Sequence, residues 1–311
     1  MPVMDANTLF QTLGTLAESA AAQADFNQAL ASRLVELQKQ MNQIKDLMEG
    51  LTRGSSVAYV EDHQVVTRVL DRFVMYADTR DLAITPHLAT TGMWERGLTT
   101  FLLSAIKPGM TVVDIGANIG YFTLLAASAV GEKGLVYAFE PLPRNYEILQ
   151  KNLIANWLSE RVRCFPVALL DRPRQIELHS SSSLPGASSL FSTIACGAPV
   201  PLEDTLVLTA KTLDEVIDRQ VDVVKIDAEG SEPFILEGMK GVLERSPGIV
   251  IVMEFNLAAL KDAGWDPKQF IEQLKNSGFG LRQLTWDGVV LEGKDADFFT
   301  YPLNTMILSR S

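Results

Sequence analysis

One short run, residues 112 to 122, constrains the fold of this chain more than any other segment. It reads Val-Val-Asp-Ile-Gly-Ala-Asn-Ile-Gly-Tyr-Phe. This is the pattern of a buried strand that ends in an acid, a turn with two glycines, and the start of an apolar helix. Glycine lets the backbone approach a ligand closely, and the helix directs its first N–H groups at that ligand. The segment predicts a cofactor-binding turn; the alternative is an ordinary strand-turn-helix without a ligand.

The residues between the glycines distinguish two kinds of cofactor. A dinucleotide-binding turn has the pattern G-x-G-x-x-G, but from Gly116 onward Asn118 and Tyr121 occupy the second and third glycine positions. The acid Asp114 would repel a phosphate, whereas it suits the ammonium group of an amino acid. S-adenosylmethionine carries an ammonium and a sulfonium and has no phosphate. The turn therefore favours S-adenosylmethionine over NAD.

A second acid supports a ligand that contains a nucleoside. The apolar run from Gly134 to Phe139 predicts a strand, and Glu140 follows it, 20 residues beyond Gly120. An acid in this position accepts hydrogen bonds from ribose hydroxyls. Both NAD and S-adenosylmethionine contain a ribose, so Glu140 alone does not separate them. The alternative for Glu140 is a solvated residue that caps the strand.

Further strands are expected at residues 161–168, 221–227 and 249–253, and their apolar runs suit a parallel sheet covered on both faces. Ligands lie beyond the carboxyl ends of such strands. Asp227 and Glu229 should therefore lie at the same edge of the sheet as Asp114. Asp227, Glu254 and Asn256 are candidate ligands for Mg²⁺, because hard cations prefer oxygen. The favoured interpretation is that these groups position acceptor hydroxyls and the cofactor.

Three segments together resemble the FkbM-type family of S-adenosylmethionine-dependent methyltransferases: GMWERGLTTFLLSAIKPGMTVVDIGANIGYFTLLAA (92–127), YAFEPLPRNYEILQKNL (137–153) and VDVVKIDAEGSEPFILEGM (221–239). The resemblance extends from about Gly92 to Leu308. It implies a class I methyltransferase fold, an α/β Rossmann-like architecture with a seven-stranded, mostly parallel sheet and an antiparallel C-terminal hairpin. It also implies methyl transfer to a hydroxyl of a sugar, a glycan or a glycosylated natural product. The identity of the acceptor does not transfer.

The expected cofactor contacts follow from these segments. The resemblance places Glu95 close to the cofactor, and the loop after the third strand, from Ala168 to Asp171, is where class I enzymes meet the adenine. Asp171 either caps the adenine amino group or opens a turn. The full set of expected cofactor-binding residues is Glu95, Asp114, Gly116, Ala117, Asn118, Gly120, Tyr121, Phe122, Glu140, Pro141, Asn145, Ala168 and Asp227.

The first 50 residues are organised differently. Apolar residues recur there in alternating steps of four and three, which is the seam of a coiled coil. The seam consists of Leu9, Leu13, Leu16, Ala20, Gln23, Asn27, Leu30, Leu34, Leu37, Met41, Ile44, Met48 and Leu51. We expect residues 9–51 to join copies of the chain into a homo-oligomer. The alternative is a helix that folds back onto its own catalytic domain.

These patterns divide the chain into three segments. Residues 1–53 form the N-terminal helical, coiled-coil segment, residues 54–91 a connector and cap, and residues 92–311 the methyltransferase domain. Within the cap, the alternation in residues 72–79 predicts an edge strand. Residues 180–204 are rich in serine and proline and predict a surface insertion. This insertion is either an acceptor lid or a mobile loop.

Composition limits the partners. The formal charge of −11 argues against a nucleic-acid partner. No run of 18 apolar residues is present, so we expect no membrane span. The chain shows no pattern of a secretory signal, and Cys164 and Cys196 are too few for a disulfide framework. The expected location is the cytoplasm.

Methyl transfer to oxygen requires a group that takes the proton of the acceptor hydroxyl. Asp227 and Glu229 are the leading candidates for this catalytic role, and His179 is a more distant third. Two other functions remain open from the sequence. One is an NAD-linked oxidoreductase, and the other is a catalytically silent methyltransferase fold that serves as an assembly subunit.

Overall fold

The computed structural model describes Arg33 and residues 57–180, 194–195, 198–199, 204–292 and 297–310. Every residue of the heptad seam lies outside these residues, so the predicted self-association stays a prediction. Residues 55–311 belong to one compact unit. Across the described ranges, no helix combines the length and the apolar character that crossing a bilayer requires.

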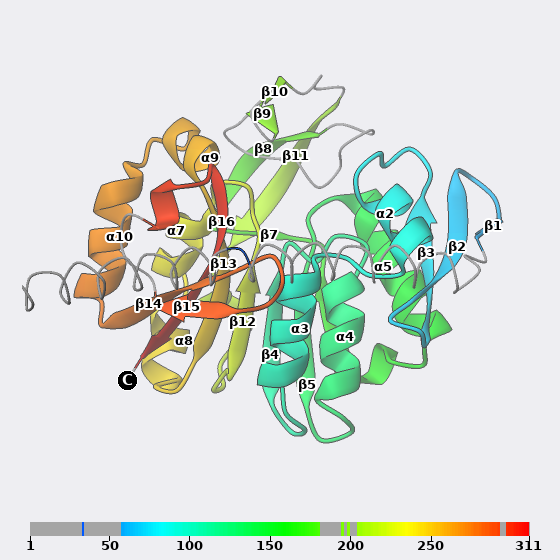
Figure 1. Cartoon of the computed structure of the whole chain (residues 1–311), viewed down its shortest axis with the longest axis horizontal. Helices are drawn as coiled ribbons and strands as arrows, with labels where there is room; N and C mark the ends of the chain where they lie inside the picture. Colours follow the sequence, from blue (N-terminus) through cyan, green and yellow to red (C-terminus); the bar gives the residue numbers. More distant parts are fainter. Residues whose placement is uncertain are drawn as a thin grey trace, which may run out of the picture. The chain divides into compact units, whose positions relative to one another are not determined.

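A central sheet organises this unit, in the order β15-β14-β16-β13-β12-β4-β5-β6 (Figure 1). Its parallel part consists of β4 (Thr111–Ile115), β5 (Leu135–Phe139), β6 (Val162–Phe165), β12 (Val223–Ile226) and β13 (Val250–Asn256). Its antiparallel part consists of β14 (Phe279–Leu284), β15 (Val290–Glu292) and β16 (Leu303–Arg310). The antiparallel pairing of β14 with β16 is the C-terminal hairpin that the sequence predicts.

The sheet has eight strands in the described residues, so the predicted count of seven is wrong. The additional strand is β15, which lies at the edge of the sheet and between β14 and β16 in the chain. A tight turn creates it: Gly288 has φ +90°, and its N–H donates to the carbonyl of Thr285 at 3.0 Å. The chain then returns along β14 and pairs Val290 with Leu284.

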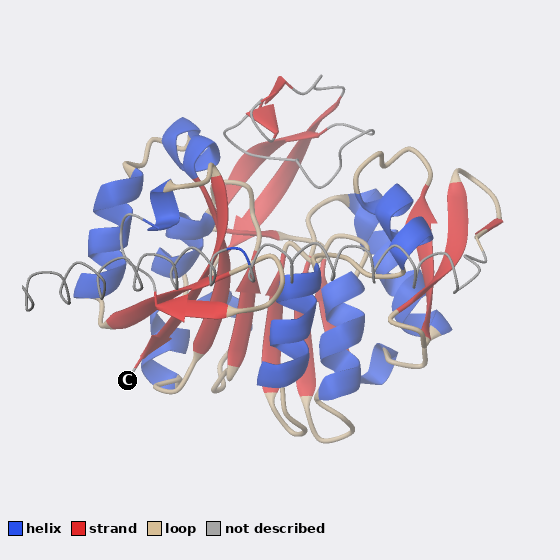
Figure 2. Cartoon of the chain, viewed as in Figure 1, coloured by secondary structure: helices blue, strands red, loops and turns tan. Residues whose placement is uncertain are grey.

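Helices cover both faces of the sheet, because successive strand residues point to opposite sides (Figure 2). Val112, Val136 and Val223 pack in one core, together with α3 (Arg96–Ala105), α4 (Tyr121–Ala129) and α5 (Pro143–Ala155). Val113, Tyr137 and Val224 pack in the other core, with α6 (Leu213–Val216), α7 (Glu232–Glu237), α8 (Lys240–Arg245), α9 (Leu257–Asp262) and α10 (Pro267–Asn276). The architecture is a three-layer α/β sandwich.

Residues 57–91 form a small antiparallel sheet followed by a helix. Its elements are β1 (Ala58–Tyr59), β2 (Gln64–Val69), β3 (Phe73–Asp78) and α2 (Ile84–Thr91). The strand β3 pairs only with β2 within the described residues, which confirms the predicted edge strand. Val65, Val69 and Met75 pack into the same core as α4 and α5. The cap is therefore continuous with the three-layer domain.

Two asparagines hold the outer edge of β3: Asn152 of α5 and Asn156, the residue directly after that helix. Asn152 accepts a hydrogen bond from the N–H of Tyr76 at 2.6 Å and donates to its carbonyl at 3.0 Å. Asn156 makes the same pair of contacts with Val74, at 3.0 and 2.7 Å. Asn152 also donates to the carbonyl of Ile119 at 2.7 Å. This one side chain joins the cap to the glycine turn.

The region around the insertion contains more strand than the sequence predicts. The expected third strand, 161–168, is shorter as β6, and a 3-10 turn, η1 (Ser159–Arg161), precedes it. Ala168 belongs instead to β7 (Ala168–Leu169) of a separate sheet with β8 (Arg174–Ser180) and β11 (Asp204–Lys211). Shorter elements are β9 (Ile194–Ala195), β10 (Ala198–Pro199) and η3 (Asp297–Phe299). The rest of the insertion lies outside the described residues, so the lid stays a prediction.

The strand order reverses between β4 and β12, and there the carboxyl ends of the strands define the ligand crevice. The backbone approaches itself very closely at this point. A Cβ placed on Gly116, whose φ is +73°, would lie 1.8 Å from the carbonyl oxygen of Asp227. Only glycine fits between the two strand ends.

We predict that Gly116→Ala destabilises the fold by about 3 kcal/mol or more, because a left-handed φ and a steric overlap act together. Gly278→Ala is the matched control: its φ is +82°, and an added Cβ there would meet nothing within 4 Å. The control should lose only about 1–2 kcal/mol. Urea unfolding of both variants measures the difference, and equal losses would contradict the close approach.

Candidate active site

A buried lysine lies at the centre of the crevice. Lys225 of β12 is 4% exposed. Its Nζ lies 3.4 Å from Oδ1 of Asp114 and 3.3 Å from Oδ2 of Asp227, and it donates to the carbonyl of Gly116 at 2.9 Å. Burial by itself lowers the pKa of Lys225, but the charges of Asp227 and Asp114 outweigh it and raise the pKa overall. Lys225 is therefore a cation that joins the ends of β4 and β12.

Sequence reasoning missed Lys225, although a signal was present. It is the charged residue inside the apolar run Val223–Ile226, all of which is buried. A lysine in a strand covered on both faces requires a buried counter-ion. The register of the parallel pair places Lys225 beside Asp114 on the neighbouring strand. A search for a buried acid near this lysine would have found the pair.

Asp114 is enclosed and faces the protein. It is 1% exposed and accepts a hydrogen bond from Oγ1 of Thr123 at 2.6 Å, while its other oxygen lies beside Lys225. The sequence predicts that this acid contacts the cofactor directly. In the structure its visible contacts are with Lys225 and the first turn of α4, so it fixes the turn that faces the ligand.

We predict that Lys225→Met destabilises the domain by about 3–5 kcal/mol, because Asp114 would remain charged and buried without its partner. The control is Lys240→Met, which removes a surface ion pair with Glu237. Such a pair contributes at most about 1 kcal/mol. Chemical unfolding at neutral pH compares the two variants, and a loss at Lys225 no larger than at Lys240 would disprove the central role of this lysine.

The glycine turn uses its own N–H groups. The five amides from Gly116 to Gly120 all donate to protein acceptors. Gly116 and Ala117 donate to the carbonyl of Phe139 at 3.0 and 2.9 Å, and Asn118 donates to Glu140 at 2.7 Å. Ile119 donates to the side chain of Asn118 at 2.8 Å, and Gly120 to the carbonyl of Ala117 at 2.9 Å. The prediction that the first N–H groups of the helix face the ligand concerns α4, which begins at Tyr121, and stays a prediction. Within the turn, Gly116 to Gly120 offer no free N–H group. A pyrophosphate needs such donors. The turn therefore suits a ligand without phosphate.

Glu140 connects this turn to the end of β5. It is 4% exposed and accepts hydrogen bonds from the N–H groups of Asn118 at 2.7 Å and Leu142 at 2.9 Å. Burial raises the pKa of Glu140 to about 7. Each carboxylate oxygen has two lone pairs, so one remains on each oxygen for a ribose hydroxyl. This arrangement fits the predicted role of Glu140.

The pKa of Glu140 predicts a pH dependence of stability. Its pKa rises from 4.5 to about 7 on folding, so the folded state binds a proton that the unfolded chain releases in this window. The contribution of Glu140 to the free energy of unfolding is therefore fully present below its unfolded-state pKa of 4.5. It is lost as the pH rises to the folded-state pKa of about 7, by about 1.4 kcal/mol per pH unit.

The matched variant is Glu140→Gln, which cannot titrate. Unfolding free energies of both proteins should be measured across the window. The difference between wild type and variant should change with pH at that slope. Parallel curves would show that Glu140 keeps an ordinary pKa.

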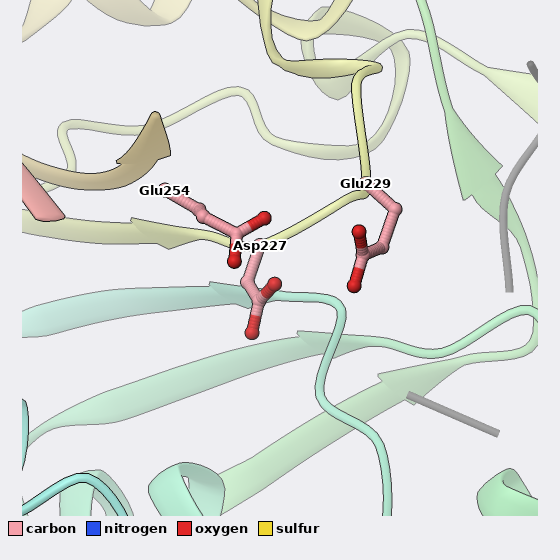
Figure 3. Close-up of side chains that lie close together, drawn as sticks. All are labelled: Asp227, Glu229 and Glu254. Carbon is pink, nitrogen blue, oxygen red and sulfur yellow. The ribbon is translucent and has the colours of Figure 1, made fainter. Parts of the chain in front are cut away.

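Three further carboxylates gather at the crevice (Figure 3). One carboxylate oxygen from each of Asp227, Glu229 and Glu254 lies within 4.8 Å of the other two. Asp227 follows β12, Glu229 lies in the next turn with a left-handed φ of 47°, and Glu254 lies within β13. Burial, and then the charge of Asp227, raises the pKa of Glu229 to about 8 and that of Glu254 well above its ordinary value. We call these three residues the acidic triad.

Glu95 adds a fourth acid near the triad. It caps the start of α3 in a left-handed conformation, with φ 38°. The residue is exposed to solvent, yet the surrounding protein desolvates its carboxylate and, with the charge of Asp227, raises its pKa to about 7. Its interaction with Asp227 agrees with the predicted position of Glu95 near the cofactor.

A buried glutamate shapes the turn that carries the triad. Glu232 is 1% exposed and accepts hydrogen bonds from the N–H groups of Ala228 and Gly230, both at 3.0 Å. Gly230 has φ +96°, and a Cβ on it would lie 2.7 Å from the carbonyl oxygen of Ala259. These contacts explain two residues of the segment from Asp227 to Glu232. Gly230 lets the backbone pass close to α9, and Glu232 holds the turn through hydrogen bonds.

Two residues that the sequence analysis singles out have hydrogen-bond partners within the protein. Asn256 does not belong to the acidic triad, because its Oδ1 caps α9 by accepting from the N–H groups of Ala258 and Ala259. Glu229 takes its place. Asp171 is held by Arg174 at 2.9 Å, which agrees with the alternative that it opens a turn.

The remaining predicted residues occupy varied positions. The side chains of Tyr121, Phe122 and Asn145 are buried, and Pro141 and Ala168 are partly buried. Phe122 lies under Lys225, whose Nζ is 5.4 Å from the ring centroid. His179 lies on β8 of the separate sheet, where its Nδ1 is 3.2 Å from Oγ1 of Thr205 on β11. That contact gives His179 a partner within the same sheet.

The matched family brings these features together. Residues 114–281 match the methyltransferase FkbM domain, and this range is more than half of the 311-residue chain. The chain belongs to the FkbM methyltransferase family. The matched range begins at Asp114, includes Glu140, Lys225 and the acidic triad, and ends in β14. Residues 114–281 therefore form an S-adenosylmethionine-dependent methyltransferase domain.

Individual relatives match with differing coverage. The tRNA (adenine(58)-N(1))-methyltransferase TrmI of Thermus thermophilus is 43% identical over 58 residues, which are 19% of this chain and 23% of TrmI. The chain thus spans less than a quarter of that relative. The hexuronic acid methyltransferase AglP of Haloferax volcanii is 27% identical over 189 residues, 59% of this chain and 69% of AglP. A crystal structure of methyltransferase FkbM from Methylobacillus flagellatus is 12% identical with a TM-score of 0.41, covering 71% of this chain and 52% of that one.

Proposed function

We propose that this FkbM protein transfers a methyl group from S-adenosylmethionine to a hydroxyl of a sugar, a glycan or a glycosylated natural product. One observation carries the proposal: a turn whose amides from Gly116 to Gly120 are all hydrogen-bonded within the protein lies beside a cluster of carboxylates at the switch point of the sheet. The similarity to AglP, a hexuronic acid methyltransferase, supports a sugar acceptor. The same turn disfavours an NAD-linked oxidoreductase.

The chain's residues divide the work of binding. Gly116 allows the strand ends to meet, Glu140 offers oxygens to ribose hydroxyls, and Glu95 lies near enough to Asp227 for their charges to interact. The buried ion pair between Asp114 and Lys225 holds the glycine turn and the end of β12 together. When bound, S-adenosylmethionine supplies a methyl group activated by its sulfonium. The buried frame leaves little to reorganise, which favours in-line attack.

Transfer requires a hydroxyl oxygen in line with the methyl group and an acceptor for its proton. The new C–O bond forms as the C–S bond breaks, and the electron pair of that bond stays on sulfur. The hydroxyl proton moves to a carboxylate. Asp227, whose side chain is 35% exposed, and Glu229 are the groups at the crevice that can take it.

We predict that Asp227→Asn lowers turnover by about 10²–10⁴-fold, the contribution of a positioned base. The fold should stay intact, because Lys225 keeps Asp114 and the carbonyl of Gly116 as partners. The control is Asp218→Asn, at an exposed position. Activity and melting temperature are measured together, and near-normal turnover of Asp227→Asn would remove it from the catalytic role.

The function itself is tested with an isotope-labelled methyl donor and a panel of acceptors: hexuronic-acid glycans, neutral glycans, glycosylated natural products and tRNA. Mass spectrometry of the products should locate the label on a sugar hydroxyl. In parallel, S-adenosylhomocysteine should raise the melting temperature, and NADH should not. Label on tRNA alone, or stabilisation by NADH alone, would refute the proposal.

A further inference from the structure

The acidic triad concentrates negative charge beside a site that already contains a compensated pair. Lys225 lies between Asp114 and Asp227, so these two acids share its single positive charge. Glu229 and Glu254 bring two more carboxylates within 4.8 Å of Asp227. Like charges at this spacing repel strongly in a desolvated site unless a proton or a cation separates them.

Glu254 supplies an independent observation. Its Oε2 is completely buried and has no hydrogen-bond partner in the described part of the chain. Its carboxylate extends from β13 towards Asp227 (Figure 3). A buried carboxylate oxygen without a partner costs free energy, so its presence requires a reason. A ligand that this oxygen can bind supplies one.

We propose that Asp227, Glu229 and Glu254 together bind one hard divalent cation of the Mg²⁺ or Ca²⁺ type. All three offer carboxylate oxygens, which such cations prefer. Two oxygens on opposite sides of a cation lie about 4.1 Å apart for Mg²⁺ and roughly 5 Å apart for Ca²⁺. The spacing of at most 4.8 Å lies within the Ca²⁺ limit, so a single ion of that size can contact all three residues. Mg²⁺ requires the three carboxylates to draw in to its shorter spacing.

This site differs from the one that the sequence suggests, because Glu229 replaces Asn256 and makes the ligand set fully anionic. Three protein ligands leave further coordination positions for water or for acceptor oxygens. A bound cation would orient an acceptor hydroxyl and favour loss of its proton. That role rests on the proposed methyl transfer, whereas binding of the ion does not.

Calorimetry of the full chain, freed of metal by a chelator and dialysed, tests the site. Mg²⁺, Mn²⁺ and Ca²⁺ are titrated separately at neutral pH. At least one should bind with one site per chain. Glu254→Gln should weaken that binding by about tenfold or more, since it removes one anionic ligand. Its melting temperature without metal should not fall, because the amide resembles the neutral acid that burial favours.

Glu244→Gln is the matched control, because Glu244 is exposed on α8 and should leave the affinity unchanged. Absence of binding by all three cations would overturn the inference. So would an affinity that survives both Glu254→Gln and Glu229→Gln. Either result would leave protons shared among the triad as the source of its stability.

The same sample separates this inference from the proposed function. S-adenosylhomocysteine is titrated into chelator-treated protein, and methyl transfer is assayed with and without the cation. Binding and transfer that persist in chelator would refute a cation role while the methyltransferase function stands. Cation binding at the triad without methyl transfer to any acceptor would refute the function while the site stands.

Discussion

The ion pair between Lys225 and Asp114 is the constraint on which the site depends. It connects neighbouring parallel strands at the point where the sheet reverses direction, and the same ammonium group binds the carbonyl of Gly116. An uncompensated charge at this depth is so costly that both partners have to be present. The glycine turn and the end of β12 are therefore held in one fixed relation, and the turn needs no ligand to keep its shape.

Much of this frame was predictable from the sequence. The strand ends at Phe139 and Ile226 follow from apolar runs that stop at an acid, and the end at Ile115 follows from the glycine after it, where the backbone turns sharply. The parallel order then places Asp114, Glu140 and Asp227 at one edge. These features are local in sequence, so periodicity and residue type are enough to find them.

The rest depends on contacts that no local pattern encodes. The sequence cannot show that the amides of Gly116 and Ala117 are used by Phe139, because that contact crosses between strands. Asn256 has the residue type and the position of a cation ligand, but its side-chain oxygen accepts hydrogen bonds from the first N–H groups of α9. Glu229 enters the acidic triad only because Glu232 and Gly230 bend the chain back. In each case a competing tertiary hydrogen bond decides the role of the residue.

The amide side chains in and directly after α5 have a consequence for how the protein behaves at high concentration. An edge strand offers N–H and C=O groups that can recruit a strand from another molecule and nucleate fibrils. Asn152 and Asn156 satisfy those groups on β3 from within the same chain. This border of the cap is thereby sealed against strand addition, without the charges or prolines that commonly serve this purpose.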